Sequence, residues 1–380
     1  MRRVGKSYLL RQVMVDLHNR GLPQERILYI NKESLDFDEL QTYKHLHEHV
    51  QRKCPADGTP RCICVDEVQE IASWQKAIVS LAGEPATDVY ISGSNARLLS
   101  GDLATSLAGR YVEIPVYALT FREFLQFRAA NDQPVRDEFQ RYARYGGLPA
   151  IHHLEFTDET IFQYISSLYN TVLLKDVIAR HEVRNVSLLE RLSRYLFDCV
   201  GTEFSANSIA NFLKNQRVKA SVETVQNYVS FLLSALVLHR VGRYDIRGKR
   251  HLETSEKYYL EDIGMRHALL GFREGSLAAV LENLVYHELR ARRYSVSIGR
   301  VGSTEVDFVA EKEGVRCYMQ VAYLLQSDDT VAREFGALRA IRDNYPKYVI
   351  TMDDAWGDEV DGIRRLNLVE WLRDPKASPV

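Results

Sequence analysis

Three short stretches near the start of the sequence carry side chains that could bind and hydrolyse a nucleotide. The first is Gly5-Lys6-Ser7, the last three positions of the phosphate-binding pattern G-x-x-x-x-G-K-[ST]. In that pattern backbone N–H groups cradle the phosphates, the lysine reaches the β- and γ-phosphates, and the hydroxyl binds Mg²⁺. The first glycine of the pattern would fall one position before Met1, so the sequence holds only the second half of the loop.

The other two stretches place polar side chains after apolar runs. Asp66 and Glu67 follow the run 62–65, and Ser94 and Asn95 follow a second run. An acid in this position can hold Mg²⁺ through water, and a second acid can polarise the water that attacks the phosphate. A polar residue after the next strand can sense the γ-phosphate. Each stretch alone is a weak signal, since an acid after a strand is often a helix cap, but their order predicts a site for ATP and Mg²⁺.

A parallel sheet is the element that would bring these residues together. Short apolar runs at 26–30, 62–67, 88–94 and 111–116 alternate with segments of helical periodicity. This alternation predicts an α/β fold in which a parallel P-loop NTPase sheet is covered by helices on both faces. The carboxyl ends of parallel strands lie along one rim, which is where such sheets bind ligands.

The stretches "RRVGKS", "ICVDEVQEI", "ISGSNARLLS" and "LAGRYVEIPVYALTFREFL" resemble the AAA+-type P-loop ATPases of bacteria and archaea that carry a C-terminal domain of unknown function. The resemblance covers nearly the whole chain. It implies a Walker A motif, a Walker B motif, a sensor and an arginine finger or second sensor, with a polar residue near the site. By the resemblance, Walker A is Gly5, Lys6 and Ser7, and Walker B is Asp66 and Glu67. The sensor is Ser94 or Asn95, the arginine finger or second sensor is Arg110, and the polar residue near the site is Gln69.

The sequence departs from this family at its front. In the family, the strand before the loop lies inside the sheet, and no such strand precedes Gly5. Loss of an inner strand leaves its neighbours with unpaired backbone groups, at about 1 kcal/mol or more for each buried group. We therefore expect a first strand missing from a truncated chain whose natural start lies upstream, and tight nucleotide binding by the sequence as it stands is left open.

Four ranges follow from the changes of pattern along the chain: an ATPase core (1–130), an aromatic-rich helical connector or lid (131–186), a small unit (187–260) and a last α/β unit (261–380). Three helices and a basic hairpin predict a winged helix-turn-helix in the small unit. Its basic side chains could contact DNA phosphates, or form a solvated or packing surface. They are Arg217, Lys219, Arg243, Arg247, Lys249 and Arg250.

The last unit resembles the restriction-endonuclease-like fold, whose metal site takes a helix Glu, a strand Asp and an E-x-K on the next strand. Glu282 and Asp307 match in type and place, but the third element reads Gln320-Val321-Ala322. A glutamine brings no charge to a metal, and an alanine cannot replace the lysine that stabilises charge on the phosphate. We expect an inactive domain kept for binding or assembly, with Glu305 as one residue that could be recruited.

Composition bounds the alternatives. The chain has 380 residues, 46% of them hydrophobic and 26% charged, and a formal charge of −2, which fits a globular protein of two or three domains. A nucleic-acid surface would then have to be a local patch. Five scattered cysteines argue against a disulfide framework and fit a cytoplasmic protein. The longest apolar stretch, 229–238, is too short to span a membrane.

The sequence therefore predicts an ATP-binding AAA+-type ATPase whose Mg²⁺-dependent hydrolysis is coupled to a winged-helix unit and a C-terminal unit. DNA or a protein is the expected partner, and a homo-oligomer is one arrangement that the resemblance allows. Two alternatives stay open. One is a metal-dependent nuclease, and the other is a non-catalytic adaptor with a degenerate nucleotide site.

Overall fold

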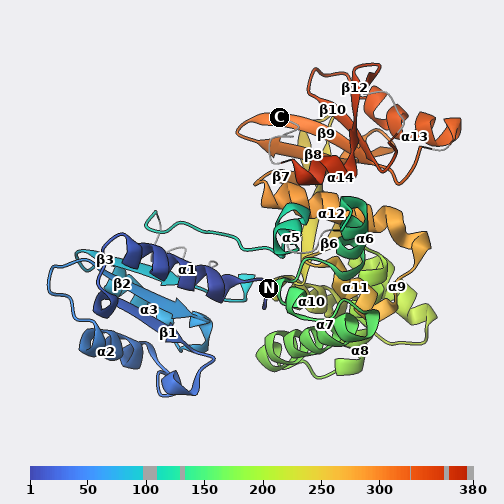
Figure 1. Cartoon of the computed structure of the whole chain (residues 1–380). Helices are drawn as coiled ribbons and strands as arrows, with labels where there is room; N and C mark the ends of the chain where they lie inside the picture. Colours follow the sequence, from blue (N-terminus) through green and yellow to red (C-terminus); the bar gives the residue numbers. More distant parts are fainter. Residues whose placement is uncertain (97–108, 129–132, 326, 355–358, 375–380) are drawn as a thin grey trace. The chain divides into compact units, whose positions relative to one another are not determined.

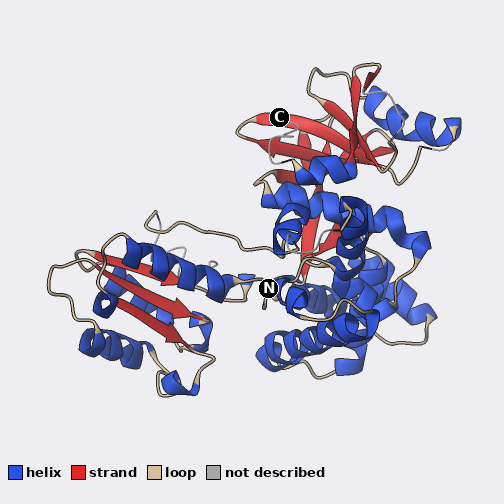
Figure 2. Ribbon diagram, in the orientation of Figure 1, coloured by secondary structure: helices blue, strands red, loops and turns tan. Residues whose placement is uncertain are grey.

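The computed structural model describes residues 1–96, 109–128, 133–325, 327–354 and 359–374. The chain divides into two compact units (Figures 1 and 2). The first comprises Met1–Val116 and the short segment Ser234–Leu236, and the second comprises Tyr117–Leu233 and Val237–Val380. None of the helices in these described residues combines the length and apolar character that crossing a membrane requires.

The first unit is a small parallel sheet with helices on both faces. Its helices are α1 (Lys6–Asn19), α2 (Tyr43–Lys53) and α3 (Trp74–Ala82), and its strands are β1 (Ile27–Asn31), β2 (Arg61–Asp66) and β3 (Thr87–Ile91). The strands lie in the order β1-β2-β3, and both pairs are parallel. The mixed α/β fold and the parallel sheet predicted from the sequence are therefore present.

Side-chain alternation along β2 separates the two faces of this sheet. Ile63 and Val65 belong to a buried cluster with residues of α2 and α3, such as Leu46 and Ile78. The alternate positions of β2 face the other way, and α1 contacts β2 on that side (Figure 1). Helices on opposite faces leave the rim at the carboxyl ends of the strands uncovered, which is the edge where the predicted site residues fall.

The strand predicted at 111–116 is wrong. Residues 110–116 have no regular structure, and Val112 and Ile114 are exposed. A strand needs a neighbour with which to exchange backbone hydrogen bonds. Among the described residues the sheet ends at β3, and no strand lies beside 111–116. The alternating apolar pattern of this segment is therefore not used in pairing here.

The second unit joins a helical layer to a large mixed sheet. Its helices are α5 (Phe121–Phe127), α6 (Val135–Tyr145), α7 (Asp158–Val172), which continues as a π-helical segment (Leu173–Ala179), α8 (Val186–Asp198), α9 (Ala206–Asn215), α10 (Val222–Ser234), α11 (Ile263–Leu270), α12 (Leu277–Ala291), α13 (Asp328–Arg339) and α14 (Leu368–Arg373). Local signals set several of the ends. The Thr120 hydroxyl and the Glu123 side chain, for example, form a capping box that starts α5.

The strands of the second unit are β4 (Glu203–Phe204), β5 (Leu238–Asp245), β6 (Arg250–Leu260), β7 (Ser295–Val301), β8 (Thr304–Lys312), β9 (Val315–Val321), β10 (Lys347–Thr351), β11 (Glu359–Val360) and β12 (Ile363–Asn367). They form one sheet in the described residues, in the order β11-β12-β10-β9-β8-β7-β5-β6-β4. The hairpin β5–β6 is antiparallel, and β5 also pairs in parallel with β7. The hairpin predicted as a wing is thus part of the same sheet as the C-terminal strands.

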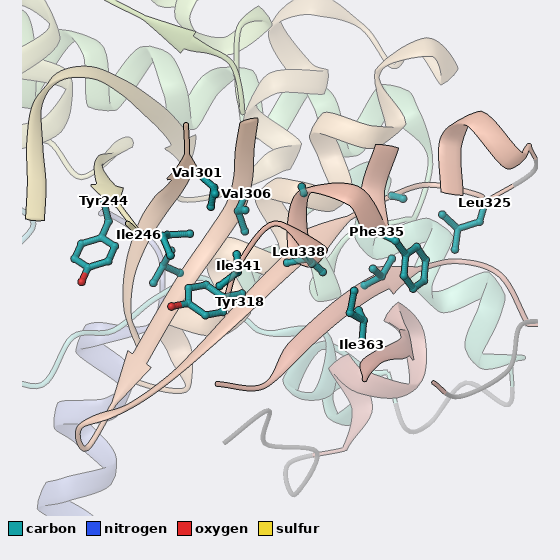
Figure 3. Close-up of a cluster of buried hydrophobic side chains, with 14 residues drawn as sticks. Tyr244, Ile246, Val301, Val306, Tyr318, Leu325, Phe335, Leu338, Ile341 and Ile363 are labelled. Carbon is teal, nitrogen blue, oxygen red and sulfur yellow. The ribbon is translucent and has the colours of Figure 1, made fainter. Parts of the chain in front are cut away.

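A buried cluster shows how closely that hairpin is tied to the C-terminal strands (Figure 3). Tyr244 of β5 and Ile246 of the hairpin tip are buried with Val306 of β8, Tyr318 of β9 and Phe335 of α13. One apolar core therefore spans residues on both sides of the boundary predicted at 260. The assignments to a winged helix and to an endonuclease-like fold stay predictions.

A close approach of distant backbone segments fixes the start of the second unit. The Gly147 N–H donates to Asp262 Oδ2 at 2.7 Å, and the Leu119 N–H donates to the Gly147 carbonyl oxygen at 2.7 Å. A Cβ added at Gly147 would overlap the Leu119 carbonyl oxygen, so the two backbone segments could not stay this close. A glycine at this position is what allows the approach.

We therefore expect Gly147→Ala to lower the free energy of unfolding by about 3 kcal/mol, because a backbone shift would also break the two hydrogen bonds. Thermal or urea unfolding of the full chain measures this loss. Gly336→Ala is the matched control, since a Cβ at Gly336 in α13 meets nothing within 4 Å, and it should leave stability unchanged or slightly raised. Equal stabilities for the two variants would contradict the prediction.

Candidate nucleotide-binding site

The phosphate-binding half-loop leads into the first turn of α1. Gly5 caps the helix with φ 105°, in the left-handed region that favours glycine. Lys6 is the first helical residue, and its Nζ donates to the Met1 carbonyl oxygen at 2.6 Å. Ser7 follows at a half-buried position. The backbone N–H groups of a helix start, a lysine and a hydroxyl are thus close together, which is the donor set that binds phosphate.

Asp66 is the last residue of β2 and is buried at the rim of the sheet. Its Oδ2 accepts a hydrogen bond from the Tyr29 hydroxyl at 2.9 Å, and its Oδ1 accepts one from the Ser92 hydroxyl. Burial, reinforced by the bond to Asp66, raises the pKa of Tyr29 to about 12, so this phenol stays a donor. Two hydroxyl donors, one on β1 and one directly after β3, therefore fix the carboxylate of Asp66 in place.

Glu67 is the next residue and lies at the centre of the site. Its backbone is left-handed, with φ 54°, which costs energy for a residue with a side chain. The Ser94 hydroxyl donates to Glu67 Oε2 at 3.0 Å, and the Gln69 amide donates to the same oxygen. Lys6 Nζ lies 3.8 Å from Glu67 Oε1. The three stretches singled out in the sequence therefore meet at this one carboxylate.

Two further predicted residues are placed less centrally. Asn95 is buried, next to Ser94 after β3. Arg110 is exposed, and no contact joins it to the Lys6–Glu67 pair within the described part of the chain. The end of the family-like stretch "ISGSNARLLS", at 97–100, lies outside the described residues.

The donor set of this rim fits Mg²⁺ bound together with a nucleotide. Ser7, Asp66 and Glu67 offer oxygen ligands, the kind that Mg²⁺ takes in proteins. No group of three or more His, Cys, Asp or Glu side chains able to hold a metal occurs among the described residues.

The comparison with known proteins identifies the family. Residues 1–125 match the AAA domain, and residues 136–276 match a domain of unknown function, DUF8612. An uncharacterized protein of Haemophilus influenzae is 36% identical over 375 residues, which cover 98% of this chain and 92% of that protein. The chain belongs to the family of this protein. Its N-terminal part is an AAA-type domain of the nucleotide-binding P-loop ATPases.

Other relatives are more distant. The uncharacterized protein MJ1544 of Methanocaldococcus jannaschii is 27% identical, over 97% of this chain and 85% of its own. A Walker-type ATPase of Pyrococcus abyssi, PABY2304, superposes with a TM-score of 0.47 at 14% identity, covering 71% of this chain and 89% of that one. The Aeropyrum pernix ORC1 protein, solved in complex with DNA, gives 0.33 at 15% identity, covering 70% and 84%. Superpositions this weak carry no conclusion about function.

The residues of the predicted nuclease-like site do lie together in the second unit. Asp307 Oδ2 accepts from the Val321 N–H at 2.8 Å, and the Gln320 side-chain oxygen accepts from the Asp307 N–H at 3.3 Å. Glu282, on α12, is joined to them through a lysine that the sequence analysis did not select, Lys257 of β6. Gln320 thus binds the backbone of β8, a role that its neutral amide can fill.

The predicted DNA-contacting residues separate into two groups. Five are exposed, on the turn after α9 and at the tip of the β5–β6 hairpin: Arg217, Lys219, Arg247, Lys249 and Arg250. Arg243 is buried instead, and its Nε lies 3.2 Å from Glu203 Oε1. Arg243 therefore contributes to the packing of β5 and is not presented to a partner in this structure.

Three residues of these clusters were missed by the sequence analysis: Tyr29, Ser92 and Lys257. Tyr29 is opposite Cys64 in the register of β1 and β2, so only a correct strand pairing would have placed it beside Asp66. Ser92 follows β3 by one residue, and the same rim argument that selected Ser94 could have found it. Lys257 could have been noticed because it begins the apolar stretch "KYYLED". A lysine that points into the core from such a strand needs an acidic partner.

Proposed function

We propose that this chain is an ATPase in which Lys6 and Ser7 hold the phosphates and Mg²⁺, Asp66 holds the ion through water, and Glu67 polarises the attacking water. Bound Mg²⁺ would neutralise charge on the phosphates. The observation that carries the proposal is the meeting of Lys6, Ser94 and Gln69 at the carboxylate of Glu67. Side chains from the start of α1, from the turn after β2 and from the segment after β3 thus converge on one buried carboxylate, as binding of a charged ligand at that end of the sheet requires.

The contacts of Glu67 also support a resting state. Its Oε2 accepts hydrogen bonds from a hydroxyl and an amide, and its Oε1 faces the Lys6 ammonium at 3.8 Å. A triphosphate would attract the ammonium of Lys6 away from Glu67, because its negative charge is larger and closer to the helix start. Nucleotide binding would thereby prepare Glu67 for its task. The exposure of Arg110 supports a role at the site of a neighbouring copy.

Calorimetric titration of ATP into the full chain, with and without Mg²⁺, tests this function. We expect Mg²⁺ to tighten ATP binding about tenfold and EDTA to stop hydrolysis, because the ion screens phosphate charge beside two carboxylates. Ser7→Ala should lose most of the effect of Mg²⁺. Ser80→Ala, on α3, is the matched control and should keep it. A wild-type chain that binds no ATP would favour the non-catalytic adaptor.

A second function, DNA binding coupled to the ATPase, is favoured by the exposed basic side chains. Arg247, Lys249 and Arg250 crowd a tight hairpin tip, where Asp245 Oδ1 accepts from the Arg247 N–H at 3.2 Å. This tip carries its charges outward, a suitable arrangement for the phosphate backbone of a duplex. We propose binding through the phosphates, independent of the base sequence, because the charges that the described part of this hairpin presents are those of Arg and Lys side chains at its tip.

Replacing Arg247, Lys249 and Arg250 by Gln together tests this contact. We expect the affinity for a mixed-sequence DNA duplex at low salt to fall about tenfold or more, and the salt dependence of log K to decrease by about 3 if all three side chains meet phosphates. Fluorescence anisotropy at several salt concentrations measures both. Arg364→Gln with Arg373→Gln removes exposed charge elsewhere in the same unit and should change neither. Identical salt slopes for all three proteins would favour a protein partner instead.

A further inference from the structure

A lysine is buried at the centre of a group of carboxylates in the second unit. Lys257 of β6 is 3% exposed, and lysines are almost never buried to this degree unless they are paired. Its Nζ lies 2.9 Å from Glu282 Oε1 of α12 and 2.6 Å from Glu305 Oε1 of β8, with Asp307 Oδ1 at 4.0 Å. Three carboxylates from two different elements thus surround one ammonium.

The carboxylates are held in place by other groups as well. The Tyr259 hydroxyl donates to Glu282 Oε1 at 2.6 Å, and the Val321 N–H donates to Asp307 Oδ2 at 2.8 Å. Burial raises the pKa of both Glu282 and Asp307, because it disfavours their charged forms. Burial alone would lower the pKa of Lys257, but Glu282, Asp307 and Glu305 raise it above its ordinary value, so the ammonium stays charged.

The cation at the centre of these carboxylates is the Lys257 ammonium, and as the described residues stand, no group of three such side chains can hold a metal. Carboxylates converging from a helix and a strand are the ligands that Mg²⁺ and Mn²⁺ take, yet the common point between them is filled by an ammonium with three N–H donors. A divalent ion at the same point would be repelled by the ammonium at close range. Ala322, directly after β9, has no charged group. The cation of this cluster is instead the Lys257 ammonium of β6.

We propose that Lys257 is a built-in cation, which takes the place of a divalent metal ion between Glu282, Glu305 and Asp307. The cluster then binds α12, β6 and β8 to one another by charge pairing and performs no metal-dependent cleavage of DNA. Removing the ammonium would leave three oriented carboxylates without a counter-charge and so create a divalent-metal site. The proposal stands independently of the ATPase function, because its residues all lie in the second unit.

The test compares the full chain, without nucleotide, as wild type, Lys257→Met, and Lys257→Met combined with Asp307→Asn. Mn²⁺ binding is followed by electron paramagnetic resonance of the free ion and by thermal unfolding. We expect Lys257→Met to lower Tm by several degrees and about 1 mM Mn²⁺ to restore much of that loss. The Lys257→Met variant should bind Mn²⁺ about tenfold more tightly than the wild type does. Adding Asp307→Asn should remove the gain.

Two results would overturn the proposal. One is a Lys257→Met chain that folds but gains no Mn²⁺ binding over the wild type. The other is that the wild-type chain binds Mn²⁺ or cleaves a DNA duplex with Mn²⁺, and that the single change Asp307→Asn abolishes this binding or cleavage. This second comparison needs no lysine variant, so it decides the matter even if Lys257→Met fails to fold. Equal Mn²⁺ binding by the wild type and Asp307→Asn, with no cleavage, supports the built-in cation.

Discussion

Replacing Glu67 by Gln should reduce the rate of ATP hydrolysis about 100- to 1000-fold while leaving ATP affinity within about threefold, because a positioned general base contributes about that factor. Glutamine has nearly the same shape as glutamate, and its side-chain oxygen can still accept from the Ser94 hydroxyl, which lies 3.0 Å from Glu67 Oε2. What is lost is the charge that polarises water. Phosphate release at saturating Mg²⁺–ATP measures the rate, and calorimetry measures the affinity.

The control for this prediction is Glu48→Gln, which removes a carboxylate from the exposed face of α2 and should leave hydrolysis unchanged. The unfolding temperature of Glu67→Gln should stay near that of the wild type, since its left-handed backbone is kept and the neutral amide relieves a buried charge. If hydrolysis by Glu67→Gln matched the wild type, Glu67 would be a structural acceptor for Lys6 and Ser94, and another group would have to activate water.

The meeting of Lys6, Ser94 and Gln69 at Glu67 could be anticipated from the sequence because it follows from one rule of parallel sheets. Asp66, Glu67 and Ser94 were selected only by their places after apolar runs, and the ends of parallel strands meet whatever the loops between them do. Two strands that pair in register, β2 and β3, bring Glu67 and Ser94 within hydrogen-bond distance. This rule requires only the order and direction of the strands. Both can be inferred from a sequence in which strand and helix segments alternate.

The predictions that were wrong or incomplete share one cause: the sequence does not say which residue or strand each segment contacts in the folded chain. The segment 111–116 has the composition of a strand, but composition cannot supply the neighbouring strand that pairing requires. Arg243 and Arg247 lie four residues apart in one hairpin, yet the first pairs with Glu203 inside the sheet and the second is exposed. Lys257 was passed over since its partner Glu282 is on a helix after the hairpin, a contact that no local pattern encodes.

The largest loss of nucleotide affinity is expected from Lys6→Met, which keeps the length of the side chain and removes its charge. Charge-assisted hydrogen bonds contribute about 1.5–3 kcal/mol each. Loss of those to two phosphates should weaken ATP binding by about 3–4 kcal/mol, or about 100- to 1000-fold. Titration of ATP in the presence of Mg²⁺ measures this. Lys76→Met, which removes an exposed ammonium lying over the ring of Tyr43 on the surface of the same unit, should bind as the wild type does.

The same substitution also tests the link between Lys6 and Glu67. Without the ammonium at 3.8 Å, Glu67 keeps only the hydroxyl of Ser94 and the amide of Gln69 as partners. Because a buried carboxylate is stabilised by a nearby cation, removing the ammonium should lower the unfolding temperature of Lys6→Met in the absence of nucleotide. Combining Lys6→Met with Glu67→Gln should cost less stability than the sum of the two changes, since the charge that lacked a partner is gone. Strict additivity would show that the two side chains do not interact in solution, and the resting state inferred for Glu67 would then have to rest on Ser94 and Gln69 alone.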